Sequence, residues 1–113
     1  MESLALAKTA AAILDTKKAN HLNVVRITNV SSLGDYFVIA TGTSNTHIKA
    51  LRDHVDEKLK EEGVVPLHNE GGNGSTWLLI DYGDVIVHIF DREAAEFYDL
   101  ERLWLDAPEI DFE

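Results

Sequence analysis

The feature that most constrains the fold is a pair of strand-like segments separated by only two residues. Residues 76–82 and 85–90 are rich in β-branched, aromatic and other apolar side chains, and Gly83-Asp84 stands between them. A glycine in the first position of a two-residue loop favours a type II′ turn, which joins neighbouring antiparallel strands. Such a turn fixes the register, so Tyr82 pairs with Val85 and the later pairs follow outward. The chain is therefore expected to contain a β-hairpin.

The two faces of this hairpin differ in chemistry. One is almost purely aliphatic and should be covered by helices: Leu78, Ile80, Tyr82, Val85, Val87 and Ile89. The other mixes aromatic rings with polar groups: Trp77, Leu79, Asp81, Ile86, His88 and Phe90. Burying an unpaired polar group costs about 1–3 kcal/mol. This mixed face either binds a partner through its aromatic rings, or is covered by a helix while Asp81 and His88 pair with each other.

Three helices are predicted from apolar residues at helical spacing. The first covers residues 2–17. The second is capped by Ser44 and ended by Gly63. The third runs from Ala94 to Leu105 and cannot pass the proline that follows. The helices should pack on a sheet.

The remaining strands complete that sheet. His21–Thr28 is rich in β-branched residues, and Tyr36–Ala40 is a continuous apolar run that suits a central strand buried on both faces. Val64–Leu67 is expected to be a short edge strand, because Pro66 cannot donate a hydrogen bond within a sheet. We therefore predict a single α/β domain with a mixed β-sheet flanked by helices.

Size and composition agree with one soluble domain. The chain has 113 residues, enough for one core of ordinary size but not for two. It has no cysteine, which excludes disulfide frameworks, thiolate zinc sites and cysteine nucleophiles. It shows neither a signal-peptide pattern nor an apolar run long enough to cross a membrane, so a cytoplasmic protein without a membrane partner is expected.

The net charge of −10 narrows the choice of partner. Between Asp91 and Glu113 there are nine acidic and two basic residues. Proteins bind phosphate backbones by neutralising them with lysine and arginine, so direct sequence-specific contact with nucleic acid is not expected. A basic protein partner fits this charge better, although acidic segments also serve solubility alone.

Catalytic and metal sites receive little support from the sequence. The Thr41–Ser44 segment, a glycine turn before a helix, can bind an anion, but it lacks a P-loop lysine and is better explained as a turn with a helix cap. The histidines lack the spacing of a metal site; they are His21, His47, His54, His68 and His88. No nucleophile accompanies Asp81 and His88. We therefore expect no enzyme activity, no metal and no cofactor.

Four blocks of sequence together resemble the ribosomal silencing factor (Iojap) family. They are Asp35–Ser44, Glu70-Gly71 followed by Trp77, Asp81–Phe90, and Phe97–Trp104. The resemblance implies a nucleotidyltransferase-like α/β fold without transferase activity. It also implies binding to the large ribosomal subunit through its protein L fourteen, which blocks joining of the small subunit under nutrient limitation. Such a protein represses translation and regulates ribosome biogenesis negatively.

Two details accompany this resemblance. The second strand offers Asp35 alone, whereas the two-metal chemistry of nucleotidyl transfer needs several carboxylates. The chain departs from the family pattern at Asn20, Thr46 and Ala95, so no role is assigned to these three residues.

From the hairpin and the resemblance we expect the partner-binding residues Trp77, Asp81, His88, Phe90, Tyr98, Leu100, Glu101 and Trp104. Leu100 and Trp104 lie four apart on one helix face and are expected to share it with the core. Residues 1–108 should form the domain and 109–113 an acidic C-terminal tail. Two alternatives stay open: a nucleotide-binding or residual nucleotidyltransferase enzyme that uses the Thr41–Ser44 turn, and a homodimer that hides the mixed face in the free protein.

Overall fold

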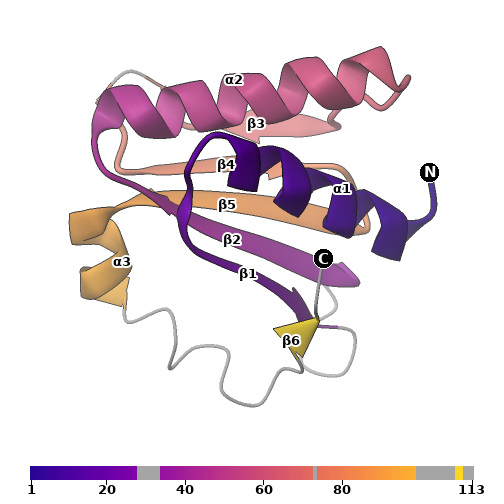
Figure 1. Ribbon diagram of the computed structural model, residues 1–113, viewed down its shortest axis with the longest axis horizontal. Coiled ribbons are helices and arrows are strands. Elements are labelled where there is room, and N and C mark those ends of the chain that lie inside the picture. Colours follow the sequence, from indigo (N-terminus) through magenta and orange to yellow (C-terminus); the bar gives the residue numbers. More distant parts are fainter. Residues whose placement is uncertain (28–33, 73, 99–108, 111–113) are drawn as a thin grey trace.

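A computed structural model describes residues 1–27, 34–72, 74–98 and 109–110. In chain order the elements are α1 (Ser3–Thr16), β1 (Asn20–Arg26), β2 (Tyr36–Gly42), α2 (Asn45–Glu61), β3 (His68–Glu70), β4 (Trp77–Asp81), β5 (Val85–Asp91), α3 (Arg92–Tyr98) and β6 (Glu109–Ile110). The strands form one sheet in the order β3-β4-β5-β2-β1-β6 (Figure 1). β2 and β5 pair in parallel, and the other neighbours are antiparallel. The predicted single α/β domain with a mixed sheet is confirmed.

β2 is the central strand that the sequence predicted. All seven of its residues are buried, and it lies between β5 and β1. A strand covered on both faces needs apolar side chains in both directions, which explains the uninterrupted run from Tyr36 to Ala40.

Helices α1 and α2 cover one face of the sheet (Figure 1). Each begins at a capping side chain: Glu2 accepts hydrogen bonds from the amides of Leu4 and Ala5, and Ser44 accepts one from His47. The apolar stripe of α2 packs on the sheet, and its members are Ile48, Leu51, Val55 and Leu59. The aliphatic face of the hairpin joins the same core, as expected from the alternation of its side chains.

The opposite side of the sheet, called the second face below, carries a smaller apolar cluster. It is formed by Val25, Ile27, Phe37, Ile39, Ile86, Phe90 and Ala94. Ala94 belongs to α3, so this short helix packs on the second face. The two faces of the hairpin therefore lie in two different environments, as the sequence predicted.

The hairpin turn has the geometry that its glycine indicates. Gly83 has a φ of 94°, a value that suits the first loop position of a type II′ turn, and Asp84 has no positive φ. The amide of Tyr82 donates to the carbonyl oxygen of Val85 over 2.9 Å, and Asp81 pairs with Ile86. The predicted register is confirmed.

Two predicted elements need correction, the edge strand and the third helix. The edge strand is β3, not Val64–Leu67; Pro66 keeps the earlier segment out of the ladder, and only the Leu67 amide bonds to β4, at Asp81. The third helix begins at Arg92, two residues earlier than expected, and its predicted residues 99–105 lie outside the described residues.

Two residues of the predicted acidic tail belong to the sheet. Glu109 and Ile110 form β6, which pairs with Val25 and Val24 of β1 in antiparallel register.

Within the described part of the chain, no helix has the length and apolar character needed to cross a membrane.

Candidate functional site

The hairpin of β4 and β5 presents the residues selected from the sequence on the second face. Trp77 pairs with Phe90, and Leu79 pairs with His88. Because side chains alternate along a strand, these four point away from α1 and α2. The site is therefore built on a rigid two-stranded element whose register a tight turn fixes.

Four rings form what we call the aromatic cluster: Phe37, Trp77, His88 and Phe90. The indole Nε1 of Trp77 donates a hydrogen bond to Nδ1 of His88 over 3.2 Å. The Trp77 ring is stacked on Phe90, with centroids 5.2 Å apart and planes inclined by 21°. Phe37 of β2 meets the His88 ring edge-on, with centroids 4.5 Å apart. Trp77 is thus held by a hydrogen bond and by a stacking contact.

The rings of this cluster differ in their exposure to solvent. Trp77 is 41% exposed, whereas His88 is 7% and Phe90 3% exposed. Phe37 is buried as well. Within the cluster, Trp77 is the ring with a large exposed surface. It contacts the buried rings of His88 and Phe90, whereas Phe37 packs against His88.

The buried imidazole of His88 is neutral at physiological pH. Burial lowers the pKa of His88 to about 4, because a charged ring loses its hydration among aromatic neighbours. Nδ1 accepts the proton of Trp77, so the ring's own proton resides on Nε2. Nε2 is buried and has no hydrogen-bond partner among the described residues.

Asp81 lies at the turn end of β4, and its carboxylate forms a hydrogen bond within the turn. Its Oδ1 accepts a hydrogen bond from the amide of Gly83 over 2.7 Å. The proposed pairing of Asp81 with His88 is therefore wrong, because Asp81 bonds to the amide of Gly83 and His88 bonds to Trp77. A short aspartate side chain readily bonds the amide two residues ahead in a turn, whereas His88 sits diagonally across the hairpin beside Trp77.

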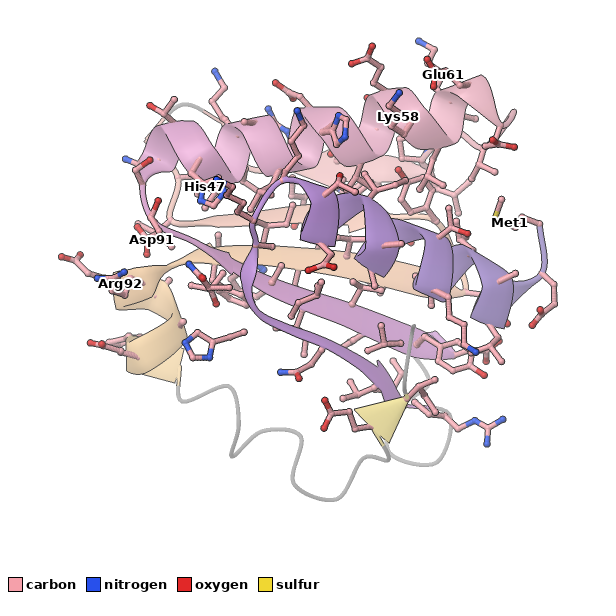
Figure 2. The ribbon with its side chains drawn as sticks, viewed as in Figure 1. Met1, His47, Lys58, Glu61, Asp91 and Arg92 are labelled. Carbon is pink, nitrogen blue, oxygen red and sulfur yellow. The ribbon has the colours of Figure 1, made fainter. Side chains whose placement is uncertain are left out.

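Helix α3 extends the same side of the molecule. Asp91 ends β5, and its carboxylate accepts the amide of Ala94 over 2.8 Å, which starts the helix at Arg92. Figure 2 shows Asp91 and Arg92 where β5 passes into α3. Ala94 is buried on the second face, whereas Phe97, one turn later, is 81% exposed.

The other selected residues follow in the chain. Tyr98 is the last residue of α3, and Leu100, Glu101 and Trp104 lie outside the described residues. The structure thus brings Trp77, His88 and Phe90 together and places Asp81 at the opposite end of β4.

The turn between β2 and α2 is closed by its own side chains. The amide of Thr43 donates to Nδ1 of His47 over 2.9 Å, and the amide of His47 donates to Oγ of Ser44 over 3.0 Å. An added Cβ at Gly42 would lie 2.6 Å from Cγ2 of Ile48. These amides already have acceptors, so the geometry favours the turn-and-cap interpretation over an anion site.

Metal-ligating side chains are dispersed. Among residues 1–27, 34–72, 74–98 and 109–110, no three His, Asp or Glu side chains gather closely enough to hold a metal ion.

Comparison with known proteins decides the family. The sequence profile described as "Ribosomal silencing factor during starvation" matches residues 1–113. The chain belongs to the ribosomal silencing factor family. It is 34% identical over 113 residues to the ribosomal silencing factor RsfS of Bacillus subtilis, covering 100% of this chain and 96% of the relative. The recognition of the family from four sequence blocks is confirmed.

Two further comparisons show how far this silencing-factor likeness extends. A crystal structure of a Chromobacterium violaceum protein superposes with a TM-score of 0.86 at 36% identity, covering 92% of this chain and 87% of the other. A protein of Mus musculus named "Mitochondrial assembly of ribosomal large subunit protein 1" is 30% identical over 97 residues, which cover 81% of this chain and 42% of that protein. The fold of this chain is therefore shared with an experimental structure over most of both chains.

The charge of this chain is distributed unevenly along the sequence. The helix layer, residues 1–18 and 44–63, contains seven acidic and seven basic residues and is formally neutral. The rest of the chain contains thirteen acidic and three basic residues, so it carries the whole net charge of −10. The segments that form α1 and α2 are thus neutral in sum, and the net negative charge belongs to the rest of the sequence.

Sequence reasoning missed Phe97 as an exposed aromatic residue of this chain. The spacing of Phe97, Leu100 and Trp104 indicates a single apolar stripe along a helix. Ala94 carried the signal, because it lies three residues before Phe97 and has a side chain small enough to pack closely on the sheet. When a short helix is anchored through an alanine, the large side chain one turn later need not be buried.

Proposed function

We propose that this chain binds the large ribosomal subunit and occupies space that the small subunit needs, so that it represses translation without a catalytic step. The observation that carries this proposal is the family match over the whole chain. The name of the Mus musculus relative supports it, because that protein is linked to the large subunit. Docking alone is sufficient for such an effect.

The contact is proposed to centre on Trp77. This ring is exposed and rests on the buried ring of Phe90, a combination that offers apolar area at low cost in conformational entropy. Exposed Phe97 belongs to α3, which packs on the same face of the sheet through Ala94. Tyr98, Leu100, Glu101 and Trp104 are proposed to extend the contact along the C-terminal region, while His88 and Phe90 support it.

The partner is proposed to be the large-subunit protein L fourteen, as the family resemblance implies. Ribosomal proteins that neutralise RNA phosphates are basic, and the charge of −10 outside the helix layer complements such a surface. The proposed setting is the cytoplasm under nutrient limitation, with a negative effect on ribosome biogenesis.

Co-sedimentation with purified ribosomal subunits tests this proposal. The protein should pellet with isolated large subunits and not with small subunits, and cross-linking of the complex should recover the protein L fourteen. Adding it before small subunits should reduce the fraction of joined ribosomes in a sucrose gradient. Binding to small subunits alone would contradict the proposal. Light scattering on the free protein should accompany the assay, because a homodimer that hides Trp77 would weaken binding as protein concentration rises.

The alternative of nucleotide binding needs a separate assay. The amide of Thr43 in the Thr41–Ser44 turn donates to His47, and the Ser44 side chain accepts the amide of His47, which weighs against a phosphate site. A nucleotide with magnesium at about 100 times its Kd would add about 2.7 kcal/mol to the free energy of unfolding. We expect no thermal shift with any nucleoside triphosphate.

A further inference from the structure

His88 is an unusual choice for a buried position in β5. The six residues of this strand from Val85 to Phe90 are all buried, and His88 is the one among them with a polar side chain. Nδ1 accepts the indole proton of Trp77, while Nε2 is buried without a partner among the described residues. A leucine of similar volume would fill this space without burying an unpartnered donor, so packing alone does not account for a histidine.

The hydrogen-bond acceptor at Nδ1 explains better than packing why a histidine occupies this position. Phe90 supports the face of the Trp77 ring by stacking, but a flip about the Cβ–Cγ bond can keep the ring stacked and turn the indole N–H away. The hydrogen bond to His88 removes that freedom, because it requires the indole N–H to point at one atom. Burial keeps the imidazole neutral, which preserves the lone pair that accepts the proton.

We propose that His88 is a positioning residue, which holds Trp77 in the orientation that contacts the ribosomal partner. The inference rests on the proposed function, because it takes Trp77 as a contact residue. An indole that is ordered before docking does not have to lose rotamer freedom on binding, so the benefit appears in affinity. His88 itself stays buried and does not touch the partner.

The experiment compares three variants with the unchanged protein. His88→Leu removes the acceptor, and His88→Asn retains one, since the Asn side-chain oxygen occupies nearly the position of Nδ1. Phe37→Leu is the matched control, because Phe37 contacts His88 from the other side and takes no part in the indole hydrogen bond. Affinity for isolated large subunits is measured and corrected for the folded fraction. Solvent exchange of the Trp77 indole proton is followed by nuclear magnetic resonance, with the signal assigned by its loss in Trp77→Phe.

His88→Leu should weaken binding by about threefold to tenfold, the cost of ordering one large side chain, and should accelerate exchange of the indole proton. His88→Asn should recover most of the affinity and slow exchange again. Phe37→Leu should lower stability and leave both readouts unchanged. If His88→Leu does not fold, His88→Phe replaces it, since a phenyl ring also lacks the acceptor.

The outcomes separate this inference from the proposed function. Normal binding by His88→Leu together with weak binding by Trp77→Ala overturns the positioning role and leaves the docking proposal intact. Weak binding by His88→Leu with unchanged indole exchange also overturns it, because the effect would not pass through Trp77. Normal binding by Trp77→Ala contradicts the proposed contact itself.

Discussion

The imidazole of His47 bridges the end of α1 and the start of α2. Its Nε2 lies 2.9 Å from the carbonyl oxygen of Lys17, and its Nδ1 accepts the amide of Thr43 over 2.9 Å. Both contacts are hydrogen bonds when the ring proton is on Nε2. Figure 2 shows His47 between the first turn of α2 and the chain that leaves α1. The imidazole of His47 therefore covers the turn after β2, and Gly42 has little space around it.

Gly42→Ala should destabilise the fold by about 1–3 kcal/mol, the usual cost of overpacking a tight site. The new Cβ would lie 2.6 Å from Cγ2 of Ile48, closer than real atoms come, and 3.1 Å from Nδ1 of His47, a tight contact. Urea unfolding measures the change. The matched control is Gly72→Ala, because a Cβ there meets no atom within 4 Å; it should change stability by less than about 0.5 kcal/mol. Equal stabilities for the two variants would refute the packing argument.

Trp77→Ala should weaken large-subunit binding by about 2 kcal/mol or more, roughly thirtyfold, with a much smaller loss of stability. The reason is that the ring is 41% exposed and rests on a core that remains when it is removed. A thermal melt and a binding isotherm on one preparation give both numbers, and Tyr98→Ala is measured in the same way. Val65→Ala truncates an exposed apolar side chain before β3 and should alter neither. Large stability losses with full corrected affinity would assign Trp77 and Tyr98 to the core.

Association with the large subunit should slow as salt rises. The acidic residues outside the helix layer steer encounter over about 8 Å at physiological ionic strength, and salt shortens this range. Stopped-flow or surface-based kinetics between about 50 and 500 mM salt measure both rate constants. The association rate should fall clearly, whereas the dissociation rate should change little. An association rate constant that does not change with salt concentration would contradict electrostatic steering.

The free energy of unfolding should fall as pH decreases from about 6.5 to about 4. Burial lowers the pKa of His88 from 6.5 to about 4, so within this window the unfolded chain binds a proton that the folded chain does not. The neutral imidazole of His88 contributes about 2–3 kcal/mol to the free energy of unfolding. This contribution is present above pH 6.5 and is lost as pH approaches 4.

Urea unfolding of the unchanged protein and of His88→Leu at about pH 7 and about pH 4.5 isolates this contribution. The variant should lose less stability between the two conditions. His54, whose pKa is lowered by burial and by Lys17 and Lys58, acts in the same direction but is present in both proteins. Identical pH dependence would show that His88 does not resist protonation.

Tyr82→Phe should leave stability unchanged or raise it by up to about 1 kcal/mol. The phenol oxygen of Tyr82 is buried and has no hydrogen-bond partner among the described residues, and burial raises the pKa of Tyr82. Removing the hydroxyl removes a desolvated polar atom and keeps the ring in the core under α2. A chemical-denaturation midpoint measures the change. A loss of more than about 1 kcal/mol would mean that the hydroxyl has a hydrogen-bond partner in the folded protein.

The sequence alone determined the parts of this protein that local chemistry controls. Gly83 allows the positive φ of the turn, and the turn then sets which residues of β4 and β5 face each other. Helical spacing identified the buried stripe of α2, and the unbroken apolar run identified β2 as central. These features depend on residues a few positions apart, so their neighbours are fixed by chain geometry.

Only the tertiary structure decided which partners the polar and aromatic groups of the site choose. Alternation places Asp81, His88 and Trp77 on one face, but it does not say that His88 bonds Trp77 while Asp81 bonds Gly83. It does not give the parallel pairing of β2 with β5, which brings Phe37 against His88 from a distant part of the chain. These choices depend on rotamers and on distances between segments far apart in sequence, and they are settled only when all the layers pack together.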